Sequence, residues 1–161
     1  MASWNDVEAA APELAATARL RFEAHGLGLL ATLRRDGSPR ISGIEPLFAL
    51  GEVWLGMMPG SRKAADVARD PRFALHNATT DKNVADGDAK ISGLAVPVDD
   101  EAELARFGEA FAAATGYPPP PGPFPLFKAD VREVSTVKPA GDHLAIESWR
   151  EGRGVKKVER K

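Results

Sequence analysis

Cysteine is absent from this chain, and histidine occurs three times among 161 residues. Without thiols, the chain cannot form a disulfide, a thiolate zinc site, an iron–sulfur cluster or a cysteine nucleophile. It has no run of about 18 apolar residues, and no basic-then-apolar segment resembling a secretory signal begins the sequence. We therefore expect a cytoplasmic protein with no membrane partner.

A strong excess of charge is also lacking, since the net charge is −2 and the isoelectric point is near 5.9. Nucleic-acid-binding domains are usually basic, so general nucleic-acid binding is not expected. Length and a 43% hydrophobic content predict one domain, residues 1–161, with its own core. We divide it into an N-terminal helix (1–26), a barrel (27–149) and a basic tail (150–161). The tail is either solvated or a patch for an anionic ligand.

One stretch predicts an anion-binding site. Residues 53–57 are typical of a buried strand, which turns through Pro-Gly into a helix that begins at Ser61 and ends near Asp70. Ser61 is a preferred N-cap residue, and the first-turn N–H groups of a helix lack intrahelical partners. The helix dipole favours acidic residues there, yet Arg62 and Lys63 follow. A bound phosphate explains them; the alternative is a surface helix with two solvated basic residues.

The other segments are mostly typical of strands. Asp-Gly at 36–37 joins strand-like runs at 27–33 and 40–44, and glycine accepts the positive φ of a hairpin turn. A second turn near residue 51 leads into the strand at 53–57, so the first three strands are predicted to form a meander. Helices are predicted over 3–25 and 100–114, strands over 73–77, 89–98, 124–134 and 143–149, and a proline-rich connector over 118–123. Six or seven mostly antiparallel strands indicate a barrel or a sandwich.

Several short motifs occur in an order that matches a known family. They are Leu-Ala-Thr-Leu with its Asp-Gly hairpin (30–37), the Arg40 strand, Ser-Arg-Lys-Ala through Asp-Pro-Arg (61–72), Asp-Ala-Lys-Ile-Ser-Gly (88–93) and Glu-Ser-Trp-Arg (147–150). Together they resemble the pyridoxamine 5′-phosphate oxidase-like family of flavin-binding split β-barrels, which includes flavin- and deazaflavin (F420)-dependent reductases. The resemblance implies a mainly β fold with flanking helices: a six- to seven-stranded antiparallel split β-barrel of the FMN-binding type.

The resemblance also implies a cofactor site between two subunits of a homodimer. The phosphate would be held by Arg40, Ser61, Arg62 and Lys63, and the ring and ribityl chain would be lined by Leu55, Gly56, Met57 and Met58. Glu45 departs from the family pattern, which has a basic residue at the far end of the Arg40 strand. A carboxylate close to a phosphate is repulsive, so either Glu45 points away or the ligand is placed differently.

The predicted function is an oxidoreductase that acts on a small organic substrate with FMN, or with F420 as the alternative cofactor. Such cofactors carry the hydride chemistry, so a dedicated nucleophile is not required, and none is evident. F420 has an anionic oligoglutamate tail, which the basic segment 150–161 would complement if it folded back over the site. FMN ends at the phosphate and is the better match to the Ser-Arg-Lys block.

Two other interpretations are open. A non-catalytic module could bind or store flavin, haem or another anionic cofactor in the same groove, because no catalytic acid or base can be assigned. A structural dimer with a degenerate cofactor groove would account for Glu45. No metal site is predicted, since the aspartates of the 81–88 loop miss the calcium-loop pattern. His76 could approach a ligand from the strand after the helix, although a structural role is the simpler interpretation.

Overall fold

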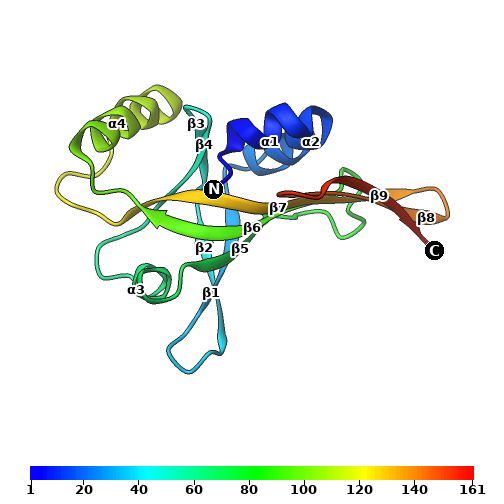
Figure 1. The fold of residues 1–161 in the computed structure, drawn as a ribbon, viewed down its shortest axis with the longest axis horizontal. Helices are drawn as coiled ribbons and strands as arrows, with labels where there is room; N and C mark the ends of the chain where they lie inside the picture. Colours follow the sequence, from blue (N-terminus) through cyan, green and yellow to red (C-terminus); the bar gives the residue numbers. More distant parts are fainter.

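A nine-stranded antiparallel sheet runs through the computed structural model, which describes all residues 1–161 (Figure 1). The strands are β1 (Gly28–Leu33), β2 (Pro39–Ile44), β3 (Leu47–Ala49), β4 (Glu52–Gly56), β5 (Arg72–Asn77), β6 (Asp88–Pro97), β7 (Leu126–Ala140), β8 (His143–Arg150) and β9 (Gly154–Arg160). The helices are α1 (Trp4–Ala10), α2 (Pro12–Glu23), α3 (Arg62–Arg69) and α4 (Glu101–Thr115). None of the four helices combines the length and the apolar character that a membrane crossing needs.

The sheet curls into an open barrel. Its strand order is β2-β1-β5-β6-β7-β4-β3, so β2 and β3 stand at opposite ends of the path. Residues 45–46 alone join them, which limits the distance between the Cα atoms of Ile44 and Leu47 to about 11 Å. No backbone hydrogen-bond ladder joins β2 to β3, so the barrel is not closed. The predicted antiparallel split barrel with flanking helices is confirmed, with nine strands in place of the predicted six or seven.

Two hairpins have the turn chemistry that their strands require. Gly37 between β1 and β2 has φ of 83°, and Pro39 occupies the first position of β2, where a missing N–H is tolerated. Leu50 and Gly51 both have positive φ, 56° and 75°, between β3 and β4. The predicted meander is wrong, because β4 pairs with β7 and with the short, unpredicted β3, and not with β2.

The predicted N-terminal helix is two helices. Ala11 separates α1 from α2 with φ −148° and ψ 64°, and Pro12 begins α2. The proline ring disfavours helical geometry in the residue before it, so the chain must bend at Ala11. Both helices then pack against the barrel core, where the Trp4 and Phe48 rings meet edge to face with centroids 4.9 Å apart.

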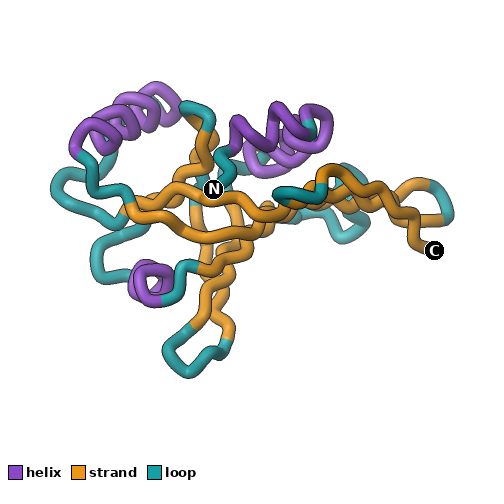
Figure 2. Tube along the Cα trace, in the orientation of Figure 1, coloured by secondary structure: helices purple, strands orange, loops and turns teal.

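Most of the basic segment predicted as a tail forms a strand, β9. β9 pairs with β8 along its whole length, and the two extend β7 into a long arm that projects from the barrel (Figure 1). The far end of this arm consists of strand and turn without a helix (Figure 2). Gly152 and Gly154 supply the positive φ of the β8–β9 turn, 74° and 70°. The high charge of the segment led to the prediction of a tail. An edge strand tolerates charged side chains because it is exposed to solvent, so charge alone does not exclude a strand.

Candidate anion and cofactor site

The predicted strand–turn–helix junction is present at β4 and α3. The chain leaves β4, turns at Gly60 with φ of 72°, and begins α3 at Arg62. Ser61 occupies the N-cap position with φ −65° and ψ 143°, and its N–H donates to the Met58 carbonyl at 3.1 Å. The first turn of α3 contains no acidic residue. Its positive dipole end therefore meets positive side chains, as the sequence predicts.

Ser61 does not cap the helix with its side chain. Its Oγ atom is buried, and it is the single buried side-chain nitrogen or oxygen in the chain without a hydrogen-bond partner. The first intrahelical bond runs from Ala65 N to Ser61 O at 3.2 Å, so the three N–H groups before Ala65 also lack intrahelical partners. An unpaired buried hydroxyl costs about 1–3 kcal/mol, and its hydrogen can turn toward an incoming acceptor. These donors together fit a group with several acceptor oxygens, such as a phosphate.

Arg40 reaches the same helix from β2. Its Nε donates to Oδ2 of Asp66 at 2.6 Å, and Thr32 Oγ1 on β1 donates to the same oxygen at 2.9 Å. Thr32 and Arg40 are register partners in the β1–β2 ladder, which places both side chains on the face that α3 covers. Arg69 adds a weaker contact to Oδ1 at 3.5 Å. The structure thus brings Arg40 to α3, where the Asp66 carboxylate holds one edge of the guanidinium.

Asp66 is a buried carboxylate that sequence analysis missed. It is 4% exposed and lies one turn after Arg62 on α3. Burial tends to raise the pKa of Asp66, but hydrogen bonds from Arg40 and Thr32 and the charges of Arg40 and Arg69 outweigh it and hold the pKa below its usual value. Nothing in the sequence distinguishes it from a solvated helix acid; its role depends on β1 and β2, which are distant along the chain.

Lys63 and Glu45 act on each other. Lys63 Nζ donates to the Gly43 carbonyl at 2.5 Å, which ties the first turn of α3 to the end of β2. Burial lowers the pKa of Lys63, and the charge of Glu45 opposes that shift. Glu45 is therefore near enough for its charge to act on Lys63, although it is exposed and forms no ion pair with it. Arg62 remains exposed and free of the ion pairs that hold Arg40.

The predicted ring-lining residues divide between two environments. Leu55 is fully buried in the main core, and Gly56 and Met58 line an apolar cavity of about 250 Å³. Met57 belongs to both, since it is buried in the main core and also lines the cavity. This aromatic cavity lies between the β3–β4 hairpin, α4 and the polyproline connector. Its walls include Trp54, Phe107, Phe111, Phe124, Pro120 and Glu45.

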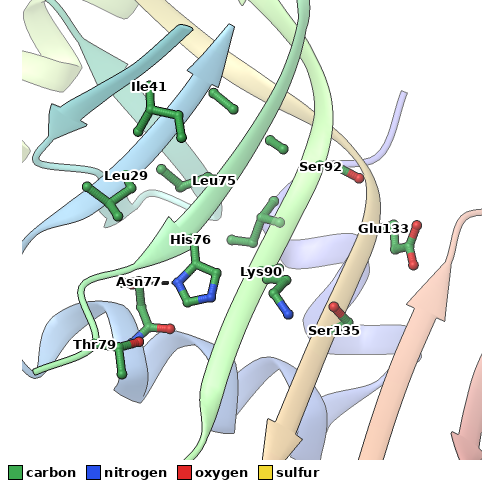
Figure 3. A pocket seen from close by; sticks show the side chains of 13 residues that line it. Leu29, Ile41, Leu75, His76, Asn77, Thr79, Lys90, Ser92, Glu133 and Ser135 are labelled. Carbon is green, nitrogen blue, oxygen red and sulfur yellow. Dashed lines mark hydrogen bonds between the residues drawn. The ribbon is translucent and has the colours of Figure 1, made fainter. Parts of the chain in front are cut away.

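A second hollow lies on the outer face of β1, β2, β5, β6 and β7 (Figure 3). Leu29 and Ile41 are 45% and 71% exposed there, beside a cavity of about 530 Å³. His76 also lines it, with Nδ1 2.7 Å from the Asn77 carbonyl. Lys90 extends from the neighbouring strand (Figure 3). No group of three or more histidine, aspartate or glutamate side chains is placed to hold a metal ion.

Comparisons with known proteins agree with this architecture. The profile of the family described as "Pyridoxamine 5′-phosphate oxidase" matches residues 14–138. No curated protein matches the chain. Among solved structures, the chain is similar to PhzG from Burkholderia lata 383 in complex with tetrahydrophenazine-1-carboxylic acid, with 19% identity, TM-score 0.61, and coverage of 93% of this chain and 89% of that one.

Two further solved structures share the fold. ChuZ from Campylobacter jejuni is 14% identical with a TM-score of 0.72, over 91% of this chain and 63% of that one. A haem-binding protein from Mycobacterium smegmatis is 19% identical with a TM-score of 0.55, over 90% of this chain and 87% of that one. At such low identities the similarity shows the fold alone.

Proposed function

Because the chain belongs to the pyridoxamine 5′-phosphate oxidase family, we propose that it is an oxidoreductase that binds FMN with its phosphate at the beginning of α3. The family generally binds FMN, and some members bind haem. The observation that carries the proposal is the unpaired, buried Ser61 Oγ, next to Arg62 and Lys63 in a turn where the helix dipole disfavours positive charge. Bound FMN supplies the electron-transfer chemistry, and the protein supplies position and charge.

Each residue of the site has a separate role in this proposal. Arg62 and Lys63 bring two full charges to a phosphate, and each well-formed charge-assisted hydrogen bond contributes about 1.5–3 kcal/mol. Arg40 has its Nε occupied by Asp66 at 2.6 Å, which leaves the Nη donors for another acceptor. Ser61 Oγ gains the partner that it lacks.

The first experiment is an absorbance spectrum of the purified protein, followed by titration of the apo-protein with FMN. We expect saturable micromolar or tighter binding and oxidation of a reduced nicotinamide donor with quinone or nitro acceptors. Binding without turnover over that panel would favour a non-catalytic module instead. A protein that binds no flavin at any salt concentration would refute the proposal.

F420 receives less support than FMN as the cofactor. The F420 argument needs the basic segment to lie over the phosphate site, but β9 pairs with β8 in the arm, whereas α3 lies at the opposite end of the molecule (Figure 1). Part of the basic charge is also paired, as between Lys157 Nζ and Glu147 at 3.4 Å. Titration with both cofactors at two salt concentrations separates them. Salt-sensitive F420 binding that Lys156→Gln with Arg160→Gln weakens would favour F420.

A second copy of the chain is the proposed partner of the outer sheet face. Family members are commonly dimers. Leu29 on β1 and Ile41 on the paired strand β2 are large apolar side chains that are 45% and 71% exposed. Burying them against the same face of a second copy would remove this apolar surface from water. A homodimer with the ring of the cofactor between its subunits is consistent with that face.

Replacing Ile41 with lysine is expected to produce a monomer. The charge would be placed in the centre of the proposed contact without disturbing the protomer, because the side chain is 71% exposed. Size-exclusion chromatography with light scattering measures the result. Leu20→Lys on α2, at a residue 57% exposed, is the matched control and should leave the dimer intact. A dimer that persists in Ile41→Lys would contradict the assignment of this face.

Haem binding is the second candidate function, and His76 favours it. Its Nδ1 lies 2.7 Å from the Asn77 carbonyl, an arrangement that fixes the ring. Its Nε2 lies 3.7 Å from Asp88 Oδ2, so this carboxylate would have to move aside before Nε2 could bind a metal. The open cavity of about 530 Å³ next to it has apolar walls, and a protein of similar fold from Mycobacterium smegmatis binds haem. A Soret shift on haem titration that His76→Ala abolishes would favour this function over the flavin enzyme.

A further inference from the structure

Residues 99–124 leave the sheet at the end of β6 and return to it at the beginning of β7. They contain α4 and the proline-rich connector, which lie beyond the ends of both strands (Figure 1). Pro97 and Phe127 are register partners in the β6–β7 ladder. The Val98 N–H donates to the Leu126 carbonyl at 2.9 Å, so the two ends of the segment lie side by side. A segment with adjacent ends can move as a unit without displacing the strands that it joins.

Few polar contacts tie this segment to the barrel. Its backbone–backbone hydrogen bonds, such as that from Gly116 N to the Ala112 carbonyl, are all internal to the segment. Its side chains form one hydrogen bond with the rest of the protein, from Lys128 Nζ on β7 to Glu103 Oε1 on α4 at 2.7 Å. A helix satisfies its backbone internally, so moving α4 away would break no backbone hydrogen bond.

The apolar attachment of the segment is also small. Phe107 is the single buried residue of α4, and it belongs to a cluster of four buried residues that is separate from the main core. Its ring packs against Trp54 with 5.4 Å between centroids. Phe111 and Phe124 pack half-buried against the same cluster. Segments with few buried apolar contacts open locally at a lower free energy than the whole domain unfolds.

This segment forms one wall of the aromatic cavity. Phe111, Phe124 and prolines 119–121 lie on its side of the cavity, and Trp54 and Met58 lie on the barrel side. Trp54 is 3% exposed beneath the Phe107 ring. Moving the segment outward would therefore open the cavity to solvent along β4 and the turn that follows it.

Lys128 has partners on both sides of this contact. Its Nζ bonds to Glu103 on α4, and it also lies 3.9 Å from Glu52 Oε1 on β4 and 5.9 Å from the Trp54 ring centroid. The two barrel partners stay in place when Glu103 moves away, and Glu103 is 34% exposed even in the closed structure. Opening thus leaves neither charge buried without a partner, which keeps its cost low.

We propose that residues 99–124 are a lid over the aromatic cavity, which opens as one unit and which the Lys128–Glu103 ion pair holds closed. The hinges lie next to Val98 and Pro125, because each is fixed to the barrel by a backbone hydrogen bond of 2.9 Å. Entry to the cavity then depends on the strength of this ion pair. The proposal is independent of the cofactor and of whether the chain is an enzyme.

One introduced thiol measures the opening, because the chain has no cysteine of its own. A Cβ at Gly56 would lie 3.9 Å from Phe124 and 4.0 Å from Phe107, so Gly56→Cys places a thiol beneath the lid in ordinary van der Waals contact. We expect Ellman's reagent to label it about 10- to 1,000-fold more slowly than a free thiol, as for an open state that is a minor population. Leu126→Cys, at a residue 2% exposed in the same cluster, is a second reporter.

Weakening the ion pair should accelerate labelling at both reporter positions. Glu103→Gln is expected to raise the rate about fivefold, as the loss of one partly exposed charge-assisted hydrogen bond implies. Glu101→Gln is the matched control, because it removes the same charge from the same first turn of α4 at an exposed residue. Glu101 forms no ion pair across the contact, which Lys128 makes with Glu103, so the control should leave the rate unchanged.

A third thiol separates lid opening from unfolding of the whole domain. Ala89→Cys lies in the main core at a fully buried residue and should label far more slowly than Gly56→Cys. Its rate should rise steeply with low concentrations of urea, whereas that of Gly56→Cys should change little, because lid opening exposes little surface. The proposal would be overturned by labelling of Gly56→Cys as fast as a free thiol, by equal rates at residues 56 and 89, or by equal effects of the two glutamate variants.

Discussion

Alanine at both Arg62 and Lys63 is expected to weaken FMN binding at least about 100-fold and to leave the fold intact. Two charge-assisted contacts at about 1.5–3 kcal/mol each correspond to about 10² to 10⁴ in affinity. Arg62 is exposed, and Lys63 contributes a single hydrogen bond to the Gly43 carbonyl, so neither residue supports the core. Fluorescence titration with FMN measures the affinity, and circular dichroism checks the fold.

The chain offers a close control in another adjacent basic pair. Arg34 and Arg35 lie next to the β1–β2 turn and are exposed, so Arg34→Ala with Arg35→Ala removes the same net charge from a place without a helix N-terminus. We expect FMN affinity to change less than about twofold in this variant. If the Arg62 and Lys63 double variant binds FMN as the unmodified protein does, the phosphate site is not at α3, and both the flavin enzyme and a flavin-storage module lose their support.

Replacing Asp66 with alanine is expected to lower the free energy of unfolding by about 3 kcal/mol. The variant leaves the Arg40 guanidinium, 23% exposed, without its charge partner and leaves the Thr32 hydroxyl, on a residue 2% exposed, without an acceptor. Urea unfolding followed by circular dichroism measures the loss. Asp70→Ala is the control, because Asp70 pairs with Arg72 at 2.6 Å at the surface and should matter far less.

A double variant separates the two roles of this ion pair. Asp66→Leu with Arg40→Met removes both charges, so much of the lost stability should return, as it does when buried pairs are replaced by apolar side chains. FMN affinity should stay low, since Arg40 is gone. Recovery of both properties would contradict a role for Arg40 at the phosphate.

The same pair contributes to the pH dependence of stability. The pKa of Asp66 lies below its ordinary value in the folded protein, so the unfolded chain binds a proton more readily. The contribution of Asp66 is therefore complete above the unfolded pKa of about 3.9, and it is lost as the pH falls through the lower folded pKa. We expect Asp66→Asn to flatten this acid limb in urea titrations between about pH 5 and pH 2. An unchanged acid limb would contradict the assignment.

Turn and helix-cap residues correctly predicted the elements that depend only on neighbouring residues. The Asp-Gly hairpin, the helix after Ser61 and the helix after Asp100 all appear, because turn glycines and N-cap residues act within a few residues. The break at Ala11 follows from an equally local rule, the effect of Pro12 on the residue before it, whereas the prediction of one helix over 3–25 rests on apolar periodicity.

Other features depend on contacts between distant segments, and no local pattern carries them. The Asp66–Arg40 pair joins α3 to β2, and the aromatic cavity needs the polyproline connector to return over β4. The N-cap position of Ser61 was predictable, but its unpaired hydroxyl was not, because a sequence does not show whether a capping residue finds its bond. The candidate site was thus found through its basic residues, and its acidic support was missed.

The gap between β2 and β3 leaves the barrel open along one side. Each of these strands pairs on one side only, so their outer backbone groups have no ladder to protect them from solvent. Amide exchange should be faster along this gap than in the strands that pair on both sides, because no interstrand hydrogen bonds join β2 to β3. Glu45 sits in the gap, Lys63 is tied to its β2 side through Gly43, and Leu47 on its β3 side lines the aromatic cavity. A molecule bound at both the phosphate site and the aromatic cavity would bridge the gap and hold β2 and β3 together.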